Sequence, residues 1–256
     1  MRPIEVYFTE HFINNTVTQF FAKACGLKFK NIREFKKEAD IIFASYGIKR
    51  NTDKAFLNSK DYIYIDHGYL NSTEREFKSD KSTIMNQFNG YFRVVKNDFY
   101  FNQDCKITCK NRFNNLGVVL KDLNKNGEKI ILSEPSEDTK NFLKIPNWTQ
   151  ETLNEIKKYS DREIIIHNKF SKVPLNFLLK EAFAFVSCQS TAGFKTIVNG
   201  VPSYFTHQSL KKHGNIKNIE KQELNYELLY IAANSQWKLK EFFLDEFNLY
   251  LNKIIS

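Results

Sequence analysis

Short apolar runs alternate with amphipathic stretches along most of the chain. In the first half, the runs that predict strands are residues 4–8, 40–45 and 61–66. Runs that are apolar almost throughout are typical of strands buried on both faces of a parallel sheet. Asn14 or Asn15, followed by apolar positions at helical spacing, predicts a helix that ends at Gly26.

The second half repeats this alternation more clearly. Its predicted strands are residues 129–132, 163–166, 183–187 and 201–205. Helices are predicted between and after them, at residues 150–159, 174–179, 191–199, 224–233 and 237–254. Strands and helices that alternate at short spacing indicate parallel sheets with helices on both faces.

Irregular segments divide this pattern. Residues 71–86 are polar and predict a mobile loop, residues 91–95 and 98–101 predict a hairpin, and residues 102–126 predict a linker. We therefore expect an α/β fold of two Rossmann-like, doubly wound halves that face a cleft. The expected domains are residues 1–115, 116–235 and a C-terminal helix at 236–256 that packs back. Ligands of such folds bind beyond the carboxyl ends of the parallel strands.

Composition adds a core and a charge imbalance. Of the 256 residues, 42% are hydrophobic and 15% aromatic, which is enough for a packed core and excludes a disordered chain. Lys and Arg number 38 against 29 Asp and Glu, a net charge of +9 that favours a polyanionic partner. The chain is also rich in Lys, Asn, Ile and Phe, whose codons are AT-rich, so genome composition is the competing explanation.

Cysteines and apolar runs restrict the cellular setting. Four cysteines are too few for a disulfide scaffold, and Cys25 and Cys188 lie among apolar residues. Cys105 and Cys109 lack the second pair or nearby His that would complete a zinc site. No apolar run has the length that spans a bilayer, and no secretory leader opens the chain. These features predict a soluble cytoplasmic protein.

A serine/threonine turn is the sharpest local signal. Residues 187–194, Ser-Cys-Gln-Ser-Thr-Ala-Gly-Phe, join a predicted buried strand to a predicted helix. Small and hydroxyl residues there leave backbone amides at the positive end of the helix, where phosphate binds. The residues predicted to bind phosphate are Gln189, Ser190, Thr191, Ala192 and Gly193. The alternative is that Ser190 and Thr191 only cap the helix.

Two more loops are expected at the same edge of the second sheet. Ser133, Glu134 and Ser136 follow one strand, and Lys169 follows another. Lys169 would neutralise a phosphate as a point charge, although a solvated lysine is an equal alternative. These loops extend the predicted phosphate site.

Residues 129 to about 237 resemble the donor half of GT-B glycosyltransferases. The resemblance rests on the segments KIILSEPSEDT, AFVSCQSTAGFKTIVNGVP and ANSQW. Capsule-polysaccharide sugar transferases have a comparable serine/threonine turn, helix and GVP-like ending. With YIDHGY at residues 64–69, the chain is more similar to small GT-B-like proteins of bacteriophages, some of which attach sugars to hydroxymethylated bases in DNA.

The resemblance implies a metal-independent glycosyltransferase with a GT-B-like cleft. Its donor would be a nucleotide sugar, with a UDP-sugar expected first, and it would have no tightly bound cofactor. The implied acceptor is a hydroxymethylated pyrimidine in double-stranded phage DNA, in the host cytoplasm. The alternatives are a capsule or lipopolysaccharide acceptor, and a catalytically silent nucleic-acid-binding protein.

One residue departs from the family pattern. The family has an acidic residue about five positions after the serine of the turn that corresponds to Ser190, and this chain has Lys195 there. A cation cannot accept hydrogen bonds from the donor ribose. Either Lys195 contacts the diphosphate, or the donor differs, or donor binding has decayed.

Transfer of a sugar to a hydroxyl group needs a base that takes the acceptor proton. Asp66 is the candidate, and His67 is an alternative base or a group that holds the acceptor or phosphate. Gly68 permits a sharp bend of the backbone, which would point the Asp66 and His67 side chains towards a cleft. The competing interpretation is that Asp66 caps the turn and His67 is structural.

Other polar and aromatic residues are candidates for acceptor binding. The predicted acceptor-binding residues are Glu10, His11, Tyr69, Arg93 and Lys96. An extruded base would stack on aromatic residues near the predicted hairpin, which are otherwise core residues: Tyr91, Phe92, Phe99, Tyr100 and Phe101. His207 and His213 have no carboxylate at a metal-binding spacing, so no metal site is expected.

Overall fold

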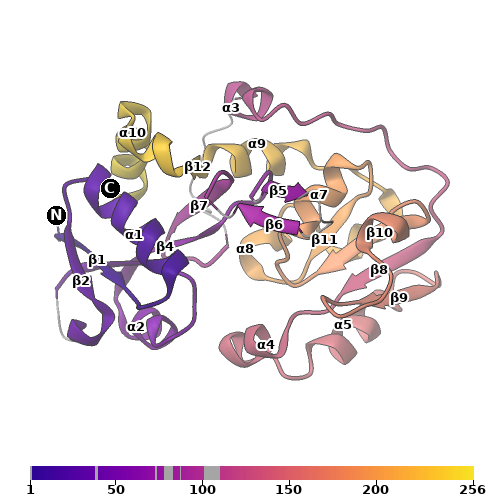
Figure 1. Cartoon of the computed structure of the whole chain (residues 1–256). Helices are drawn as coiled ribbons and strands as arrows, with labels where there is room; N and C mark the ends of the chain where they lie inside the picture. Colours follow the sequence, from indigo (N-terminus) through magenta and orange to yellow (C-terminus); the bar gives the residue numbers. More distant parts are fainter. Residues whose placement is uncertain (1, 38–39, 73, 78–82, 87, 101–109) are drawn as a thin grey trace. The chain divides into compact units, whose positions relative to one another are not determined.

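The computed structural model describes residues 2–37, 40–72, 74–77, 83–86, 88–100 and 110–256 (Figure 1). The chain divides into a first unit, residues 1–107 and 232–256, and a second unit, residues 108–231. The domain boundaries expected from the sequence were residues 115 and 235. Among the described residues, no helix is both long enough and apolar enough to cross a membrane.

The first unit has a six-stranded sheet in the order β12-β7-β4-β3-β1-β2. Four strands are parallel: β1 (Ile4–Phe8), β2 (Lys28–Asn31), β3 (Ile42–Tyr46) and β4 (Asp61–His67). Two more extend the sheet as antiparallel neighbours: β7 (Tyr91–Lys96) beside β4, and β12 (Gln236–Lys238) beside β7. The three strands predicted in this region are confirmed. β2 was not predicted because an edge strand of sequence Lys-Phe-Lys-Asn lacks an apolar run.

Both faces of this sheet are covered. Tyr7, Phe43 and Tyr64 on one face pack against Phe56 of α2 (Thr52–Asn58). The other face carries α1 (Phe12–Ala24) and the C-terminal helix α10 (Asp245–Ile255), which lie side by side in Figure 1. The ring of Phe21 meets the rings of Phe242 and Phe247, and Tyr250 Oη donates to the Val94 carbonyl at 2.6 Å. The expected packing of the C-terminal helix back onto a sheet is confirmed.

Helix α1 begins earlier than predicted. His11 occupies the N-cap position, and Asn14 lies inside the helix. Its Oδ1 accepts from the Thr9 amide at 2.7 Å and its Nδ2 donates to the Tyr46 carbonyl at 2.6 Å. Asn14 therefore ties the ends of β1 and β3 together instead of capping. Gly26, with φ of 61°, follows the helix end as predicted.

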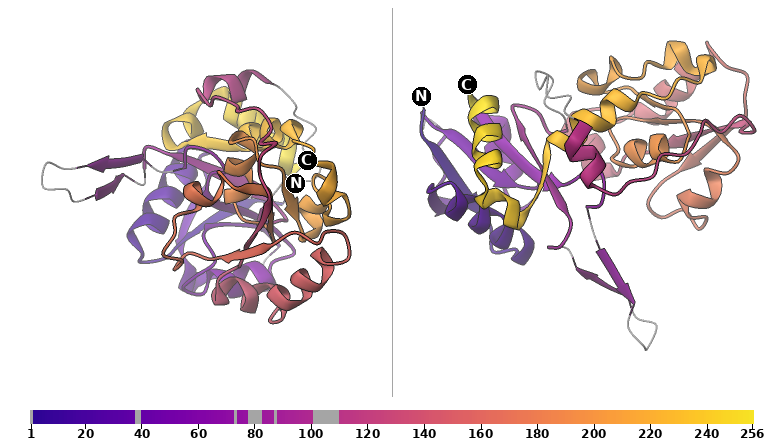
Figure 2. Two further views of the ribbon diagram at one scale, coloured as in Figure 1. Left: turned by 90° about the vertical axis from the view of Figure 1, so that its right-hand side faces the viewer. Right: turned by 90° about the horizontal axis from the view of Figure 1, so that it is seen from above.

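Two predictions for residues 71–101 are wrong. The polar segment contains an antiparallel pair, β5 (Glu74–Phe77) and β6 (Thr83–Asn86), which extends away from the six-stranded sheet in both views of Figure 2. β7 pairs with β4 and β12, so it forms no hairpin with the described residues 98–100. Asp98 instead makes a turn by accepting from the Tyr100 amide at 2.7 Å. Phe101, Cys105 and Cys109 lie outside the described residues.

The second unit has a four-stranded sheet in the order β11-β10-β8-β9. Its strands are all parallel: β8 (Lys129–Ser133), β9 (Ile164–His167), β10 (Ala182–Ser187) and β11 (Ser203–Phe205). In each unit the second parallel strand lies on one side of the first, and the third and fourth lie on the other side. The point where the order reverses, between the first and third strands, is where such sheets bind ligands. Two doubly wound, GT-B-like halves are confirmed.

Helices cover both faces of the second sheet. On one face, Leu132, Val186 and Tyr204 pack under α5 (Trp148–Ile156) and the 3-10 helix η2 (Ile216–Lys221). On the other face, Ile131 and Phe185 pack with α6 (Leu175–Leu178) and α7 (Ala192–Val198). The remaining α-helices of the described residues are α3 (Lys110–Asn115), α4 (Glu137–Leu143), α8 (Gln208–Lys211) and α9 (Tyr226–Asn234), whose last residues belong to the first unit. Two 3-10 helices, η1 (Ile32–Glu34) and η3 (Leu239–Phe243), lie in the first unit.

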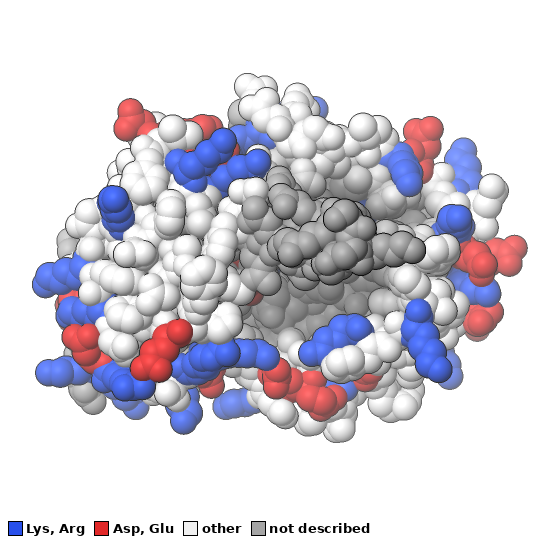
Figure 3. Space-filling view, in the orientation of Figure 1, with Lys and Arg blue, Asp and Glu red and all other residues white. Residues whose placement is uncertain are grey.

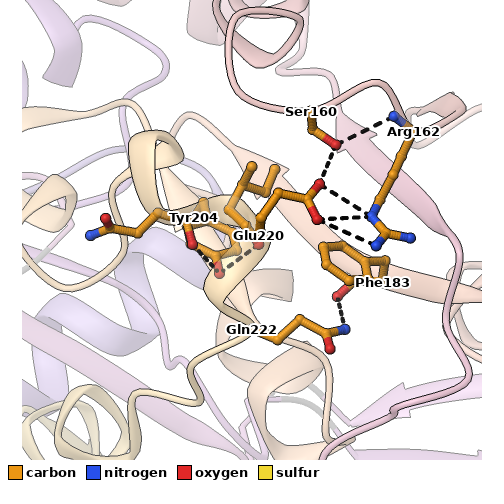
Figure 4. Close-up of polar contacts among 8 residues, drawn as sticks. Ser160, Arg162, Phe183, Tyr204, Glu220 and Gln222 are labelled. Carbon is orange, nitrogen blue, oxygen red and sulfur yellow. Dashed lines mark hydrogen bonds and ion pairs between the residues drawn. The ribbon is translucent and has the colours of Figure 1, made fainter.

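An arginine joins α5, β10 and η2 (Figure 4). The Arg162 guanidinium lies 3.5 Å from the centre of the Phe183 ring, and its nitrogens contact the Glu220 carboxylate at 3.2–3.3 Å. Ser160 donates to the same carboxylate at 2.5 Å. A planar guanidinium suits this combination of stacking and paired hydrogen bonds. The cluster fixes the turn that leads from α5 into β9.

Candidate functional site

Three of the predicted donor-binding residues meet at one cavity of the second unit. Glu134 follows β8, Lys169 follows β9, and Ser136 is the N-cap of α4. The cavity, about 360 Å³ in volume, lies at the carboxyl ends of β8 and β9. We call it the β8–β9 cavity; its lining is Glu134, Pro135, Ser136, Glu137, Asp138, Asn168, Lys169 and Phe170. The sequence therefore placed these loops at one edge correctly, while their role stays a prediction. Ser133 is the last residue of β8.

Glu134 is held by a hydrogen-bond network. Its Oε1 accepts from Lys140 Nζ at 2.9 Å and from Thr149 Oγ1 at 2.8 Å, and its Oε2 accepts from Asn168 Nδ2 at 3.3 Å. The hydrogen bonds from Lys140 and Thr149 lower the pKa of Glu134 below its usual 4.5. The carboxylate is thus ionised and fixed, and it joins β8 to α4, α5 and the loop after β9.

We expect this network to make stability depend on pH. Because the pKa of Glu134 is lower in the folded than in the unfolded chain, its contribution is complete above pH 4.5 and is lost as pH falls below that value. Between about pH 5 and pH 3, the melting temperature of the Glu134→Gln variant should therefore decrease less than that of the parent protein. Equal losses in thermal melts of the two proteins would contradict this role.

The serine/threonine turn uses most of its own amides. The Ser190 amide donates to Ser187 Oγ at 3.3 Å, the Ala192 amide to Ser190 Oγ at 3.2 Å, and the Gly193 amide to the Ser190 carbonyl at 3.0 Å. Thr191 occupies the N-cap position of α7 without a side-chain capping bond. A phosphate at this turn would compete with these internal bonds, so phosphate binding there stays a prediction.

Gln189 differs from the rest of the turn. Its side chain is 3% exposed, and neither amide atom has a hydrogen-bond partner within the described parts of the chain. A buried amide left unsatisfied costs about 1–3 kcal/mol, and such groups are rare in native proteins. Gln189 is therefore a buried residue of this turn with free hydrogen-bonding capacity. Lys195, one turn into α7, is exposed.

Gly193 has a packing role. A Cβ atom at this position would lie 2.7 and 2.8 Å from two ring carbons of Phe205, which is fully buried. We expect Gly193→Ala to lower the free energy of unfolding by about 1–3 kcal/mol, the usual cost of overpacking a core. Denaturant unfolding measures the change. Thr191→Ala is the control, because the Thr191 side chain lies in the same turn and makes no capping hydrogen bond. An unchanged free energy of unfolding in Gly193→Ala would show that close packing does not require a glycine at this position.

The first unit places Asp66 and His67 at the carboxyl edge of its sheet. They end β4, and Glu10 and His11 follow β1, so all four lie at the same edge, as predicted. Both carboxylate oxygens of Asp66 are engaged. Oδ2 accepts from Tyr64 Oη at 2.6 Å and from Arg93 Nη2 at 3.1 Å, and Oδ1 accepts from the His67 amide at 2.8 Å.

Asp66 is the counterion of a buried arginine. Arg93 is 4% exposed and also donates to the His67 carbonyl at 2.9 Å. Its guanidinium lies 5.2–5.7 Å from the ring centres of three tyrosines, Tyr64, Tyr69 and Tyr100. Burial, together with the neighbouring Asp66, raises the pKa of Tyr64 well above 10, so its hydroxyl stays a donor. This arrangement supports the structural interpretation of Asp66 that the sequence left open.

Ring contacts, rather than an ion pair, position the His67 side chain. Its ring stacks on Phe92 at 5.9 Å and meets Tyr46 edge-on. Its buried Nδ1 has no hydrogen-bond partner among the residues that the structure describes. A general base must come within hydrogen-bond reach of the proton that it takes, so the role of His67 as a base stays a prediction.

Two predicted acceptor residues lie in the core. Tyr69 is 1% exposed and donates its hydroxyl to the Tyr100 carbonyl, and Arg93 is paired as described. Their burial does not favour contact with an acceptor, and their acceptor-binding role stays a prediction. Lys96 donates to the Ile255 carbonyl at 3.1 Å, and exposed Glu10 pairs with Arg33 at 2.6 Å.

The predicted stacking residues are core residues as well. Tyr91 and Phe92 are buried, and Phe99 packs against the cluster around Tyr64. On the face drawn in Figure 3, Lys and Arg are interspersed with Asp and Glu rather than gathered into one basic patch of described residues. Neither observation favours a DNA-binding surface.

Two sequence motifs contact each other for structural reasons. Gln236, from the ANSQW segment, accepts through Oε1 from the amides of Tyr69 at 2.8 Å and Leu70 at 3.0 Å. A Cβ atom on Gly68 would lie 2.8 Å from the Tyr91 carbonyl oxygen and from Gln236 Oε1. The contact between the YIDHGY and ANSQW segments therefore fixes the backbone that follows β4.

Sequence reasoning missed a second cavity of the second unit. It measures about 520 Å³ and lies at the carboxyl ends of β10 and β11, beside α5 and α8. Trp148 and Thr206 belong to its wall, and Trp148 Nε1 donates to Thr206 Oγ1 at 2.7 Å. We call it the β10–β11 cavity. Of its lining residues, Cys188 was interpreted from the sequence as lying among apolar residues and His207 as a histidine without a metal-binding partner, and no local spacing connects the two.

The described residues bring no three His, Cys, Asp or Glu side chains into a metal-binding arrangement. The sequence matches no family model and no curated protein. Among solved structures, the chain is similar to KpsC, a beta Kdo 2,7 transferase of Thermosulfurimonas dismutans, with a TM-score of 0.50 and 9% identity. The similarity covers 96% of this chain and 99% of that chain. At this identity, it shows the shared fold.

Proposed function

We propose that this chain is a glycosyltransferase that takes a sugar from a nucleotide-sugar donor held by the second unit and attaches it to a glycan. The observation that carries the proposal is the fold similarity to a beta Kdo 2,7 transferase along almost the whole chain. The loops that converge on the carboxyl edge of the second sheet support it, because ligands of doubly wound sheets bind there.

In the transfer, the acceptor hydroxyl oxygen bonds to the anomeric carbon while the bond from that carbon to the donor phosphate breaks. The acceptor proton goes to a base, and the departing phosphate needs positive charge or amides. We assign the base to His67, because Asp66 already neutralises Arg93. Lys195 and Lys169, both exposed, are the assigned cations for the phosphate.

The same comparison supports an acceptor class. A capsule or lipopolysaccharide glycan is favoured over a hydroxymethylated base in DNA, because the solved structure with the similar fold is a beta Kdo 2,7 transferase and the face drawn in Figure 3 has no single basic patch of described residues. The DNA acceptor and the UDP-sugar donor stay predictions from the sequence resemblance.

Labelled nucleotide sugars of several nucleosides, offered with capsule-type glycans, hydroxymethylated DNA or plain DNA, test the proposal. We expect label to enter a glycan. Label in hydroxymethylated DNA alone would replace the proposed acceptor, and no transfer or donor hydrolysis with any combination would leave the silent nucleic-acid-binding alternative.

The base assignment has its own test. His67→Asn should lower kcat by about 10²–10⁴-fold, the usual contribution of a general base, with an unchanged KM for the donor. His11→Asn, at the same sheet edge, is the matched control and should change kcat far less. Full activity of His67→Asn in a folded protein would exclude His67 as the base.

A further inference from the structure

The lining of the β10–β11 cavity includes an apolar and a polar set of side chains, which we call the apolar wall and the polar wall. The apolar wall consists of Leu143, Ile145, Trp148, Cys188, Phe205 and Ile216. Burial raises the pKa of the Cys188 thiol to about 11, so this side chain is uncharged and belongs to that wall. The polar wall carries hydroxyl, amide and charged groups, among them Thr206, Gln208, Glu151 and Glu155. An apolar surface facing a few polar groups is the usual make-up of a small-molecule site.

The charged groups at this cavity are of both signs. Glu151 and Glu155 are one helical turn apart on α5, and Lys211 of α8 is the lysine among the described lining residues. The pKa of Glu155 is lowered, chiefly by its hydrogen bond from Lys158 and also by the charges of Lys211 and Lys217, so this carboxylate is ionised at neutral pH. Both carboxylates can accept hydrogen bonds from hydroxyl groups of a ligand.

We propose that the β10–β11 cavity binds an uncharged ring that carries hydroxyl groups, with the ring against the apolar wall around Trp148 and the hydroxyls on Glu151 and Glu155. A ribonucleoside and a pyranose sugar share this chemistry. The volume of about 520 Å³ lies within the range of small-molecule sites, and the carboxyl ends of parallel strands are where such ligands bind.

The chain contains its own reporter for this site. Its two tryptophans are Trp148, in the cavity wall, and Trp237, which is 1% exposed in the first unit. In a Trp237→Phe background, the emission comes from Trp148 alone. A ring that packs on the apolar wall should shift this emission in a saturable way.

The experiment titrates the full-length Trp237→Phe protein with uridine, cytidine, glucose, N-acetylglucosamine and pyrophosphate. We expect at least one ring compound to bind with a dissociation constant of roughly 0.1–1 mM, the strength usual for ligands of this size. Binding of a nucleoside or of a sugar identifies the source of the ring. Pyrophosphate should not shift the emission.

Two variants locate the binding. Gln208→Phe narrows the cavity from an exposed position, and Glu151→Gln with Glu155→Gln removes both carboxylates. Each should weaken binding at least tenfold, while Gln150→Phe, exposed on α5 outside the cavity, should bind as the parent does. No shift with any ring, an unchanged affinity in Gln208→Phe, or competition by pyrophosphate would overturn the proposal. Ring binding without sugar transfer would count only against the proposed function.

Discussion

Replacing Asp66 with Asn should lower the free energy of unfolding of the first unit by about 3 kcal/mol. The substitution leaves the Arg93 guanidinium, which is 4% exposed, without its carboxylate. An uncompensated buried charge costs about 3–5 kcal/mol, and the low end applies because a quarter of the Asp66 side chain is exposed. Denaturant unfolding of a Trp148→Phe protein, followed through Trp237, measures the change in this unit.

The double variant Asp66→Asn with Arg93→Met is the control for that result. It removes both charges, so it should recover a large part of the lost stability, because a buried ion pair is often replaceable by apolar groups. If Asp66→Asn unfolds like the parent protein, the ion pair is not structural. Where Asp66→Asn is destabilised as expected, a loss of its activity is no evidence for a base, because partial unfolding produces the same loss.

Replacing Gln236 with Met should lower the free energy of unfolding of the same unit by about 2–5 kcal/mol. Gln236 Oε1 accepts from the amides of Tyr69 and Leu70, and both residues are at most 3% exposed. Met nearly keeps the volume but removes the acceptor, and each buried N–H left unsatisfied costs about 1–3 kcal/mol. The same Trp237 unfolding experiment measures the loss.

Gln236→Glu separates the lost acceptor from other effects. It keeps an oxygen where the two amides donate, so its amides stay satisfied, although the carboxylate would be buried. We expect it to regain stability as pH is lowered and the carboxyl protonates, whereas Gln236→Met should not. A stable Gln236→Met protein would show that the contact between the YIDHGY and ANSQW segments does not hold the end of β4.

The parallel strands were predictable because burial on both faces leaves an apolar run. β3, β4, β8 and β10 follow this rule, and their carboxyl ends then bring Glu134 and Lys169 to one edge. The edge strand β2 and the three-residue strand β12 lack such an apolar run. Their pairing depends on strands that are distant in the sequence, so the local pattern could not predict them.

Polar side chains are hardest to interpret from the sequence where a long-range partner decides what they contact. Arg93 looked like a surface cation, but Asp66, 27 positions earlier, holds it in the core. Gln236 satisfies amides that lie 166 and 167 positions away. The β10–β11 cavity combines α5, α8 and two strand ends, and no local spacing rule links those segments.

Hydrogen exchange of the intact protein, with and without a panel of nucleotide sugars, tests donor binding by the second unit most directly. We predict slower exchange at the carboxyl edge of its sheet, in residues 134–140, 168–170 and 188–194, when the correct donor is present. Protection confined to the first unit, or an unchanged exchange pattern with every donor, would contradict the proposal that this unit holds a nucleotide sugar.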